Sequence, residues 1–200
     1  MSRTLEFVFD FASPNAYLAR CVLPGIAQRT GAQLRLLPCL LGGIFKLADN
    51  QSPMAAFARV KGKLEYEALE TQRFIAKHRL HRFSFNPNFP MNTLLIMRGL
   101  IAARRSGAFD VYLDAVSAAT WENGLKMDDP AVVDKVLRDA GLDGAALLAM
   151  TQDPGVKAEL LSNTEAVVKR GAFGIPTFFV GDEMFFGKER LDQVEAFLSS

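Results

Sequence analysis

The sequence is poor in the residues that usually carry redox or metal chemistry, since it has only two cysteines and two histidines among 200 residues. Cys21 and Cys39 are too far apart for a C-x-x-C pair and fit no zinc-binding spacing, so we expect two reduced packing residues. His78 and His81 lie among arginines at the expected end of a helix, where positive charge is favourable without any catalytic role. The sequence therefore predicts no metal site and no dithiol of its own.

A strong charge of one sign and a long apolar run are also missing. The formal net charge is +1, and charged residues make up 22% of the chain. This balance does not favour nucleic acid or an anionic membrane as a partner. No apolar stretch has the length of a signal peptide or a membrane span, so we expect a cytoplasmic location. Half of the residues are hydrophobic, which is enough for a sizeable core.

The first part of the chain has the pattern of a strand, a helix and a second strand. Leu5–Phe9 is a short apolar run, Pro14–Thr30 has helical spacing and is followed by Gly31, and Gln33–Leu37 alternates. With such short connections, the two strands are expected to be parallel and joined by a right-handed crossover.

The middle of the chain, from Pro53 to about Gly171, shows helical patterns and no strand pattern. The expected helices run from Ala55 to His81, Met91 to Ser106, Phe109 to Trp121, Pro130 to Ala140, Gly144 to Gln152 and Pro154 to Arg170. Strand patterns return at Thr177–Val180 and Met184–Phe186, separated by a hairpin signal, and a last helix follows from Gly187 to Phe197.

The order βαβ, many helices, ββα predicts an α/β fold of the thioredoxin-like type. We expect residues 1–50 and 172–200 to form the thioredoxin-like domain and residues 51–171 to form an all-helical insertion domain between its two halves.

Ser13 stands where the first expected helix begins. A serine followed by proline is an ordinary helix start, in which the hydroxyl caps free amides. The preceding strand, however, delivers Ser13 to the sheet edge where parallel folds build their sites. A thiolate held at this helix N-terminus would gain from the helix dipole and from the hydroxyl. Because no cysteine follows Ser13 closely, the sulfur would have to come from another molecule.

Ile175-Pro176 opens the third expected strand and is the second anchor of this site. A proline is tolerated at a strand start in either isomer, and the sequence does not reveal which one is present. The surrounding Gly174-Ile175-Pro176-Thr177 resembles the cis-proline loop of thioredoxin-like proteins, where an extended peptide can pair with the backbone as an added strand.

Three stretches carry a resemblance to a known family: Phe9–Pro14 with Tyr17, Phe173–Phe179, and Gly181–Gly187 with the following Arg190-Leu191. Asn86–Asn92 and Trp121–Gly124 match more loosely. Over its whole length the chain resembles the 2-hydroxychromene-2-carboxylate isomerases, in the branch of the thioredoxin superfamily that includes kappa-class glutathione transferases and DsbA-like proteins.

The resemblance implies a glutathione-dependent isomerase of aromatic catabolism, which interconverts 2-hydroxychromene-2-carboxylate and trans-o-hydroxybenzylidenepyruvate. The reaction requires rotation about a conjugated double bond, and transient addition of a thiolate makes that bond single. Ser13 would stabilise the thiolate of glutathione; it would not attack the substrate, because no histidine lies nearby in sequence to activate it.

The resemblance also assigns binding residues. The implied glutathione contacts are Ser13, Lys46, Ile175, Pro176, Phe186, Gly187, Lys188 and Glu189, and the implied substrate contacts are Asn88, Asn92 and Trp121. In this assignment Lys46 meets a carboxylate and Glu189 faces the γ-glutamyl amino group. Each also has an ordinary alternative: Lys46 as a solvated charge, Glu189 as a first-turn acid, and the asparagines as loop and cap residues.

One segment departs from the family pattern. Pro53–Arg59 lacks the small polar or asparagine residue that family members often carry after the prolines there, so the resemblance assigns no glutathione contact to this segment. The pocket is expected to be more apolar at this place.

Several functions stay open at the level of sequence. A kappa-like transferase would use the same bound thiolate to attack an electrophile. A DsbA-like disulfide oxidoreductase is disfavoured because Ser13-Pro14-Asn15-Ala16 replaces both redox cysteines. A non-enzymatic protein that binds a peptide or an apolar ligand would use Ser13 only as a cap. The resemblance further implies a homodimer.

Overall fold

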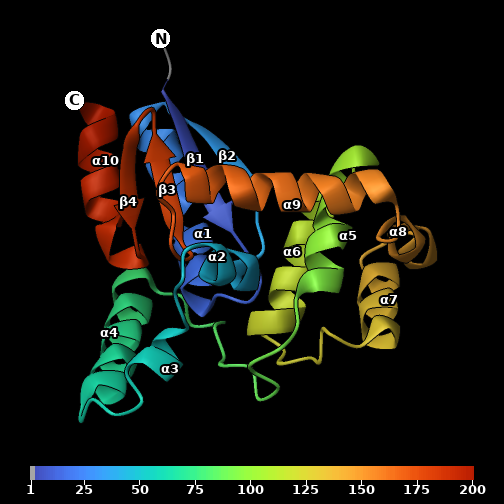
Figure 1. Cartoon of the computed structure of the whole chain (residues 1–200), viewed down its shortest axis with the longest axis horizontal. Helices are drawn as coiled ribbons and strands as arrows, with labels where there is room; N and C mark the ends of the chain where they lie inside the picture. Colours follow the sequence, from blue (N-terminus) through green and yellow to red (C-terminus); the bar gives the residue numbers. More distant parts are fainter. Residues whose placement is uncertain (1–2) are drawn as a thin grey trace.

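The computed structural model describes residues 3–200, so the first two residues of the expected 1–50 segment lie outside it. Its centre is a four-stranded mixed sheet in the order β2-β1-β3-β4 (Figure 1). The strands are β1 (Thr4–Phe9), β2 (Gln33–Pro38), β3 (Thr177–Val180) and β4 (Glu183–Phe186). β1 is parallel to β2 and antiparallel to β3, and β3 is antiparallel to β4. This topology confirms the predicted thioredoxin-like α/β fold.

Helices cover the sheet and form the long connection between β2 and β3 (Figure 1). Helix α1 (Pro14–Thr30) packs against α10 (Leu191–Ser199), which follows the short turn η1 (Lys188–Arg190). Helix α9 (Pro154–Lys169) packs against β2 and α2. The connection contains α2 (Leu41–Leu47), α3 (Pro53–Ala56), α4 (Lys63–His78), α5 (Leu94–Arg105), α6 (Phe109–Trp121), α7 (Pro130–Asp139), α8 (Gly144–Met150) and α9.

Aromatic side chains fill the core beside the sheet. Phe7 on β1 stacks on Phe178 of β3 at 5.4 Å between ring centroids, and Phe9 meets Phe11 edge-on at 5.0 Å. All four rings are buried. Each such ring contributes about 1.5–3 kcal/mol through burial. The last two rings bring this core up to the turn that carries Ser13.

A second, smaller cluster joins α1 to the helical connection. Tyr17, Leu18 and Trp121 are buried in it, and five partly buried apolar residues pack around them: Phe74, Ile75, Leu80, Phe83 and Phe89. The cluster anchors α4 and the loop after it to α1.

The single helix predicted from Ala55 to His81 is wrong. The structure has a short α3 that ends at Ala56 and a separate α4 that begins at Lys63. Gly62 between them has a φ of 79°, which a helix does not allow. The helix was also expected to end at His81, whereas α4 ends at His78 and His81 lies beyond it.

Helix α2 was not predicted, and α5 begins at Leu94 and not at Met91. Within residues 3–200, no helix combines the length and apolar character needed to cross a membrane.

Candidate active site

Ser13 lies at the N-terminus of α1, where it makes two hydrogen bonds. Its Oγ accepts from the Ala16 amide at 3.1 Å and donates to the Ile175 carbonyl oxygen at 3.0 Å. The residue is only 4% exposed. The first bond is that of an N-cap, and the second reaches across to the segment before β3. The structure thus brings together Ser13 and Ile175, which are 162 positions apart in the chain.

The Ile175-Pro176 peptide bond is cis, as the resemblance suggested. The Pro176 carbonyl accepts from the Gly187 amide at 3.0 Å. The Thr177 hydroxyl donates to the Gly174 carbonyl at 2.8 Å. These bonds fix the segment from Gly174 to Thr177 against the turn after β4.

The turn that leads to Ser13 is held by the buried carboxyl group of Asp10. Oδ1 accepts from the Ala12 amide at 2.9 Å and from the Thr93 hydroxyl at 2.7 Å. Oδ2 accepts from the Leu41 amide at 2.7 Å. Burial raises the pKa of Asp10, and these three hydrogen bonds oppose that rise. One carboxyl group therefore ties the turn to α2 and to the start of α5.

Trp121 supports the same turn from the helical connection. Its indole Nε1 donates to the Phe11 carbonyl at 2.9 Å, and the residue is 1% exposed. Its side chain lies behind the turn and leaves little surface for a ligand. The structure therefore gives Trp121 a contact with the Ser13 turn, where the resemblance implied a contact with substrate.

The turn after β4 carries an unusual buried lysine. Lys188 is 1% exposed, its Nζ donates to Glu189 Oε1 at 2.5 Å, and it lies 5.6 Å from the centre of the Phe74 ring. Gly187, with a φ of 94°, makes the turn possible. The Glu189 carboxylate is partly exposed, so its free side can still accept a hydrogen bond from a ligand ammonium.

The remaining residues singled out from the sequence lie on the surface. Lys46 is exposed in the last turn of α2. Asn88 donates through its side-chain amide to Asn86 Oδ1 at 3.2 Å and to the Gly124 carbonyl at 3.0 Å. Asn92 Oδ1 accepts from the Leu94 amide at 3.0 Å. Both asparagines thus have the loop and cap contacts expected of their ordinary alternatives.

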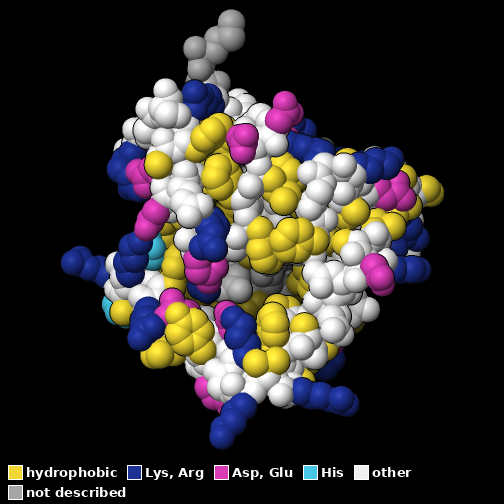
Figure 2. Space-filling model, turned by 60° about the vertical axis from the view of Figure 1, so that its left-hand side comes forward, with side chains coloured by type: hydrophobic (Ala, Val, Ile, Leu, Met, Phe, Trp, Pro, Cys, Tyr) yellow, Lys and Arg dark blue, Asp and Glu magenta, His cyan; other side chains and the backbone are white. Residues whose placement is uncertain are grey.

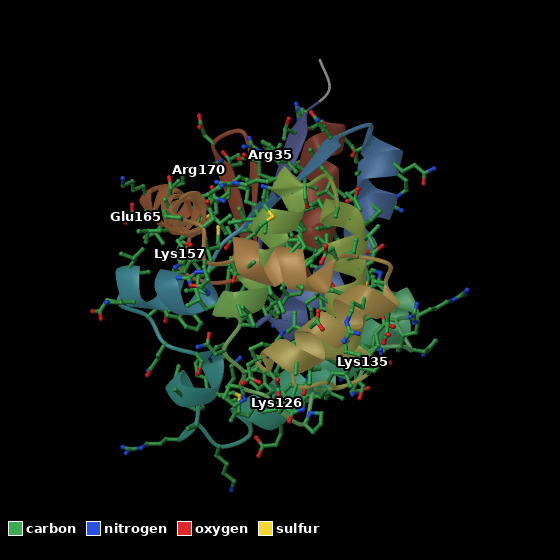
Figure 3. All side chains as sticks on the ribbon, turned by 90° about the vertical axis from the view of Figure 1, so that its right-hand side faces the viewer. Arg35, Lys126, Lys135, Lys157, Glu165 and Arg170 are labelled. Carbon is green, nitrogen blue, oxygen red and sulfur yellow. The ribbon has the colours of Figure 1, made fainter. Side chains whose placement is uncertain are left out.

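Figure 2 shows a hollow in the face that carries these elements, with hydrophobic and charged side chains around its rim. The helix pair α3–α4 forms the lower part of this face (Figures 1 and 2). From the other side of the molecule, charged side chains such as Arg35, Lys157 and Glu165 stand out around β2 and α9 (Figure 3). The hollow thus has both apolar and charged side chains around it (Figure 2).

Sequence reasoning gave no role to Asp10 or Thr93. An aspartate directly after an apolar strand was a usable signal, because a carboxylate at a buried strand end must find donors. Thr93 offered no such signal, since its partner lies 83 positions away.

The chain from residue 4 to residue 199 matches the family model of the DSBA-like thioredoxin domain. It is 29% identical to a 2-hydroxychromene-2-carboxylate isomerase of Sphingobium xenophagum, covering 99% of each chain. It is 31% identical to the enzyme of that name from Pseudomonas sp. (strain C18), covering 96% of this chain and 88% of the relative. It is 29% identical to glutathione S-transferase kappa 1 of Rattus norvegicus, covering 95% and 88%.

A solved structure gives the same picture. The structure of a 2-hydroxychromene-2-carboxylate isomerase superposes with a TM-score of 0.83 at 27% identity, covering 98% of this chain and 94% of that one. The similarity therefore extends over nearly the whole of both chains.

Proposed function

The chain belongs to the DSBA-like thioredoxin family, in the branch of the 2-hydroxychromene-2-carboxylate isomerases, and from this premise we propose that it is a glutathione-dependent isomerase. Its proposed substrate is 2-hydroxychromene-2-carboxylate or a related aromatic 2-oxo acid, and its place is aromatic catabolism. The names of the relatives support the isomerase assignment, and the kappa-class relative supports the use of glutathione.

One observation carries the proposal: Ser13 occupies the N-terminus of α1 and touches Ile175, yet positions 13–16 contain no cysteine. The groups present suit an anionic sulfur. They are the positive end of a 17-residue helix and a hydroxyl that can donate. The partly exposed Glu189 carboxylate is available separately for an ammonium group of the same ligand. A protein built in this way binds a thiolate and has none to supply.

When bound, glutathione would supply a thiolate that adds reversibly to a conjugated double bond and allows rotation about it. Ser13 holds the sulfur by donating its proton to it, and the α1 dipole favours the ionised form. The Ile175-Pro176 segment offers backbone to an extended peptide. The turn Phe186–Glu189 receives the γ-glutamyl end, and Lys46 meets a carboxylate.

In this proposal, the substrate lies on the side of the sulfur that faces the helical connection. Asn88 and Asn92 are assigned to orient its carboxylate or carbonyl groups, for which the amides would have to exchange their present loop contacts. Trp121 acts from behind, by holding the Phe11 carbonyl.

A kappa-class transferase activity is the second candidate, favoured by the rat relative. It needs the same Ser13 site and differs only in whether the thioether product is released. Turnover of a chloronitrobenzene compared with turnover of the chromene separates the two. A disulfide oxidoreductase would need a dithiol at positions 13–16, which the sequence does not have.

We further propose a cytoplasmic location, because glutathione keeps thiols reduced in that compartment and Cys21 and Cys39 are both free. We also propose a homodimer, with the aromatic-rich helical connection as its contact surface. Light scattering in solution tests the dimer, which a monomer mass would exclude.

The central test compares Ser13→Ala with a second cap variant, Asp143→Ala at α8. Asp143 Oδ1 accepts from the Ala146 amide at 2.9 Å, so both variants lose one N-cap, worth about 1 kcal/mol of stability. Ser13→Ala also loses the hydrogen bond to the Ile175 carbonyl and should be the less stable of the two. Only Ser13→Ala should lose chromene turnover, by about 100-fold, as for other donors at a developing charge. Equal turnover without glutathione, or full turnover by Ser13→Ala, would overturn the proposal.

A further inference from the structure

Two aromatic side chains lie beside the Ser13 site: Phe173 has no role in glutathione binding, and Phe186 begins the turn that receives the γ-glutamyl end while its ring remains exposed. Phe173 lies just before Gly174, and Phe186 is the last residue of β4. Their ring centroids are 4.5 Å apart, and the rings are inclined by 47°. Each residue is 40% exposed. We call this pair the Phe173–Phe186 platform.

The platform is next to the position proposed for the sulfur. Phe186 pairs with Thr177 across the sheet, and the following Gly187 amide donates to the Pro176 carbonyl. Phe173 is two residues before Ile175, whose carbonyl accepts the Ser13 hydroxyl. The two rings therefore flank the backbone segment that meets Ser13.

The platform is built into the backbone around it. A Cβ atom on Gly174 would lie 2.9 Å from Phe186 Cε2, so the ring rests directly on the glycine and any side chain there would displace it. The Asn50 side-chain amide donates to the Phe173 carbonyl at 2.8 Å and ties the platform to the segment between α2 and α3. These contacts hold both rings in place although both are exposed.

The exposure of this pair differs from that of the aromatic residues on the inner strands β1 and β3. The neighbouring Phe178 and Phe179, like Phe7 and Phe9, are buried in the core. Scattered apolar side chains on a surface need no explanation, but adjacent exposed rings at a hollow mark a binding surface. Leu47 at the end of α2 and Met54 in α3, on either side of Asn50, are also exposed.

We propose that the Phe173–Phe186 platform binds the aromatic ring of the second substrate and so sets the preference for flat, conjugated compounds. This inference rests on the proposed function for the identity of the ring. Inclined rings at this distance accept a third ring edge-to-face or offset-stacked, an arrangement worth about 0.5–1.5 kcal/mol beyond burial. The ring would lie beside the sulfur held by Ser13, which is the position required for addition to a double bond conjugated with it.

The test uses an unreactive probe, naphthalene-2-carboxylate, in the absence of glutathione. Its dissociation constant is measured by ligand-observed NMR for the wild-type chain, Phe173→Leu and Phe186→Leu. Both variants should bind the probe about 3- to 10-fold more weakly. Phe85→Leu is the control, because Phe85 is also exposed, at 56%, but belongs to the loop beside Trp121. It should bind like the wild type.

A second ligand sharpens the result. The saturated analogue decahydronaphthalene-2-carboxylate has similar size and charge but no ring face, and the two platform variants should not change its affinity. Equal weakening of both ligands, or no weakening of the aromatic one, would overturn the platform. Circular dichroism of each variant shows that it is folded.

Glutathione affinity is titrated separately by calorimetry on the same proteins. A wild-type chain that binds the naphthoate as described but no glutathione would defeat the proposed function and leave the platform standing. A chain that binds glutathione, with Phe173→Leu and Phe186→Leu behaving as wild type toward naphthoate, would overturn the platform alone. In turnover assays, the platform variants should raise KM for the chromene more than they lower kcat.

Discussion

Two helices of nearly equal length lie close to the candidate site and differ sharply in how they are held. The 17-residue α1 buries six residues, while the 16-residue α4 has no residue in the buried class. The turn before α1 is fixed by Asp10, by Trp121 and by the Ser13–Ile175 bond. α4 is attached through partly buried Phe74 and Ile75 and through the exposed Lys77–Asp192 ion pair.

The firm attachment of α1 and the loose attachment of α4 suit two different tasks, the stabilisation of charge and contact with the variable part of a substrate. A group that stabilises charge must be held in place before the reaction, because reorganisation would cost part of the gain. A boundary that meets the variable part of a substrate can be less firmly held, since segments with few buried contacts open locally at low cost. We call the Ser13 turn together with α1 the fixed wall of the candidate site, and α4 its loosely held wall.

The largest effect on the difference between the two walls is expected when the Trp121 side chain, which supports the fixed wall, is removed. Trp121→Ala should lower the free energy of unfolding by about 3–5 kcal/mol, because it empties a large volume in the buried cluster with Tyr17 and Leu18. Urea denaturation measures the change. Trp121→Phe keeps most of the volume and removes the hydrogen bond to Phe11, so it should cost less stability but still lower chromene turnover. A Trp121→Phe variant with unchanged turnover would show that this contact does not position the turn.

A change at Asp10 should have the next largest effect and should depend on pH. In Asp10→Asn the side-chain oxygen can still accept the hydrogen bonds from Ala12 and Thr93. The side-chain NH2 group then faces the Leu41 N–H, and the lost hydrogen bond between them lowers stability by about 1–3 kcal/mol. Burial raises the pKa of the Asp10 carboxyl group in the folded protein above its ordinary value of about 3.9 in the unfolded chain. The contribution of this group to stability is therefore fully present below the ordinary value and is lost as pH rises through the raised pKa. The asparagine does not titrate.

The stability advantage of the wild type over Asp10→Asn should therefore shrink as pH rises from about 4 through the raised pKa of Asp10. Urea titrations of both proteins across this range measure it. An advantage that grows with pH would mean that Asp10 is stabilised as a carboxylate, contrary to the effect of its burial.

The smallest effect is expected in the loosely held wall. In Gly62→Ala the alanine must adopt a φ of 79°, which lowers stability by about 1–2 kcal/mol. No other atom lies within 4 Å of the added Cβ atom, so the strain is confined to the backbone. Gly42→Ala is the control, since Gly42 lies inside α2 with nothing near its Cβ position and has no positive φ. Hydrogen exchange should show faster exchange in α4 for Gly62→Ala and unchanged protection in α1. Equal acceleration in both helices would show that the two walls unfold as one unit.

Much of the fold could be predicted from the sequence where local patterns agree with the final packing. The βαβ start and the ββα end follow from apolar runs, from Ser13-Pro14 as a helix start and from Gly31 as a stop, and the structure confirms them. The helical character of the long connection is confirmed as well.

The errors arose where tertiary contacts or a single backbone angle decide the structure. Gly42-Gly43 made α2 look unlike a helix, but Asp10 caps its first amide from another part of the chain. Gly62 ends one helical pattern and begins another through its positive φ. For the site, Ser13 and Ile175 could be paired in advance by resemblance, whereas the partners of Asp10 and the burial of Trp121 depend on packing that no local pattern encodes.

The Ser13 hydroxyl has a single proton, and the Ile175 carbonyl oxygen already receives it. A neutral thiol arriving there would replace the hydrogen bond to a carbonyl oxygen with a weaker one to sulfur, without net gain. An ionised sulfur would draw the proton toward itself, because hydrogen bonds to charged acceptors are about twice as strong. The turn therefore discriminates between the two protonation states of an incoming ligand at the moment of docking, before any carbon atom is involved.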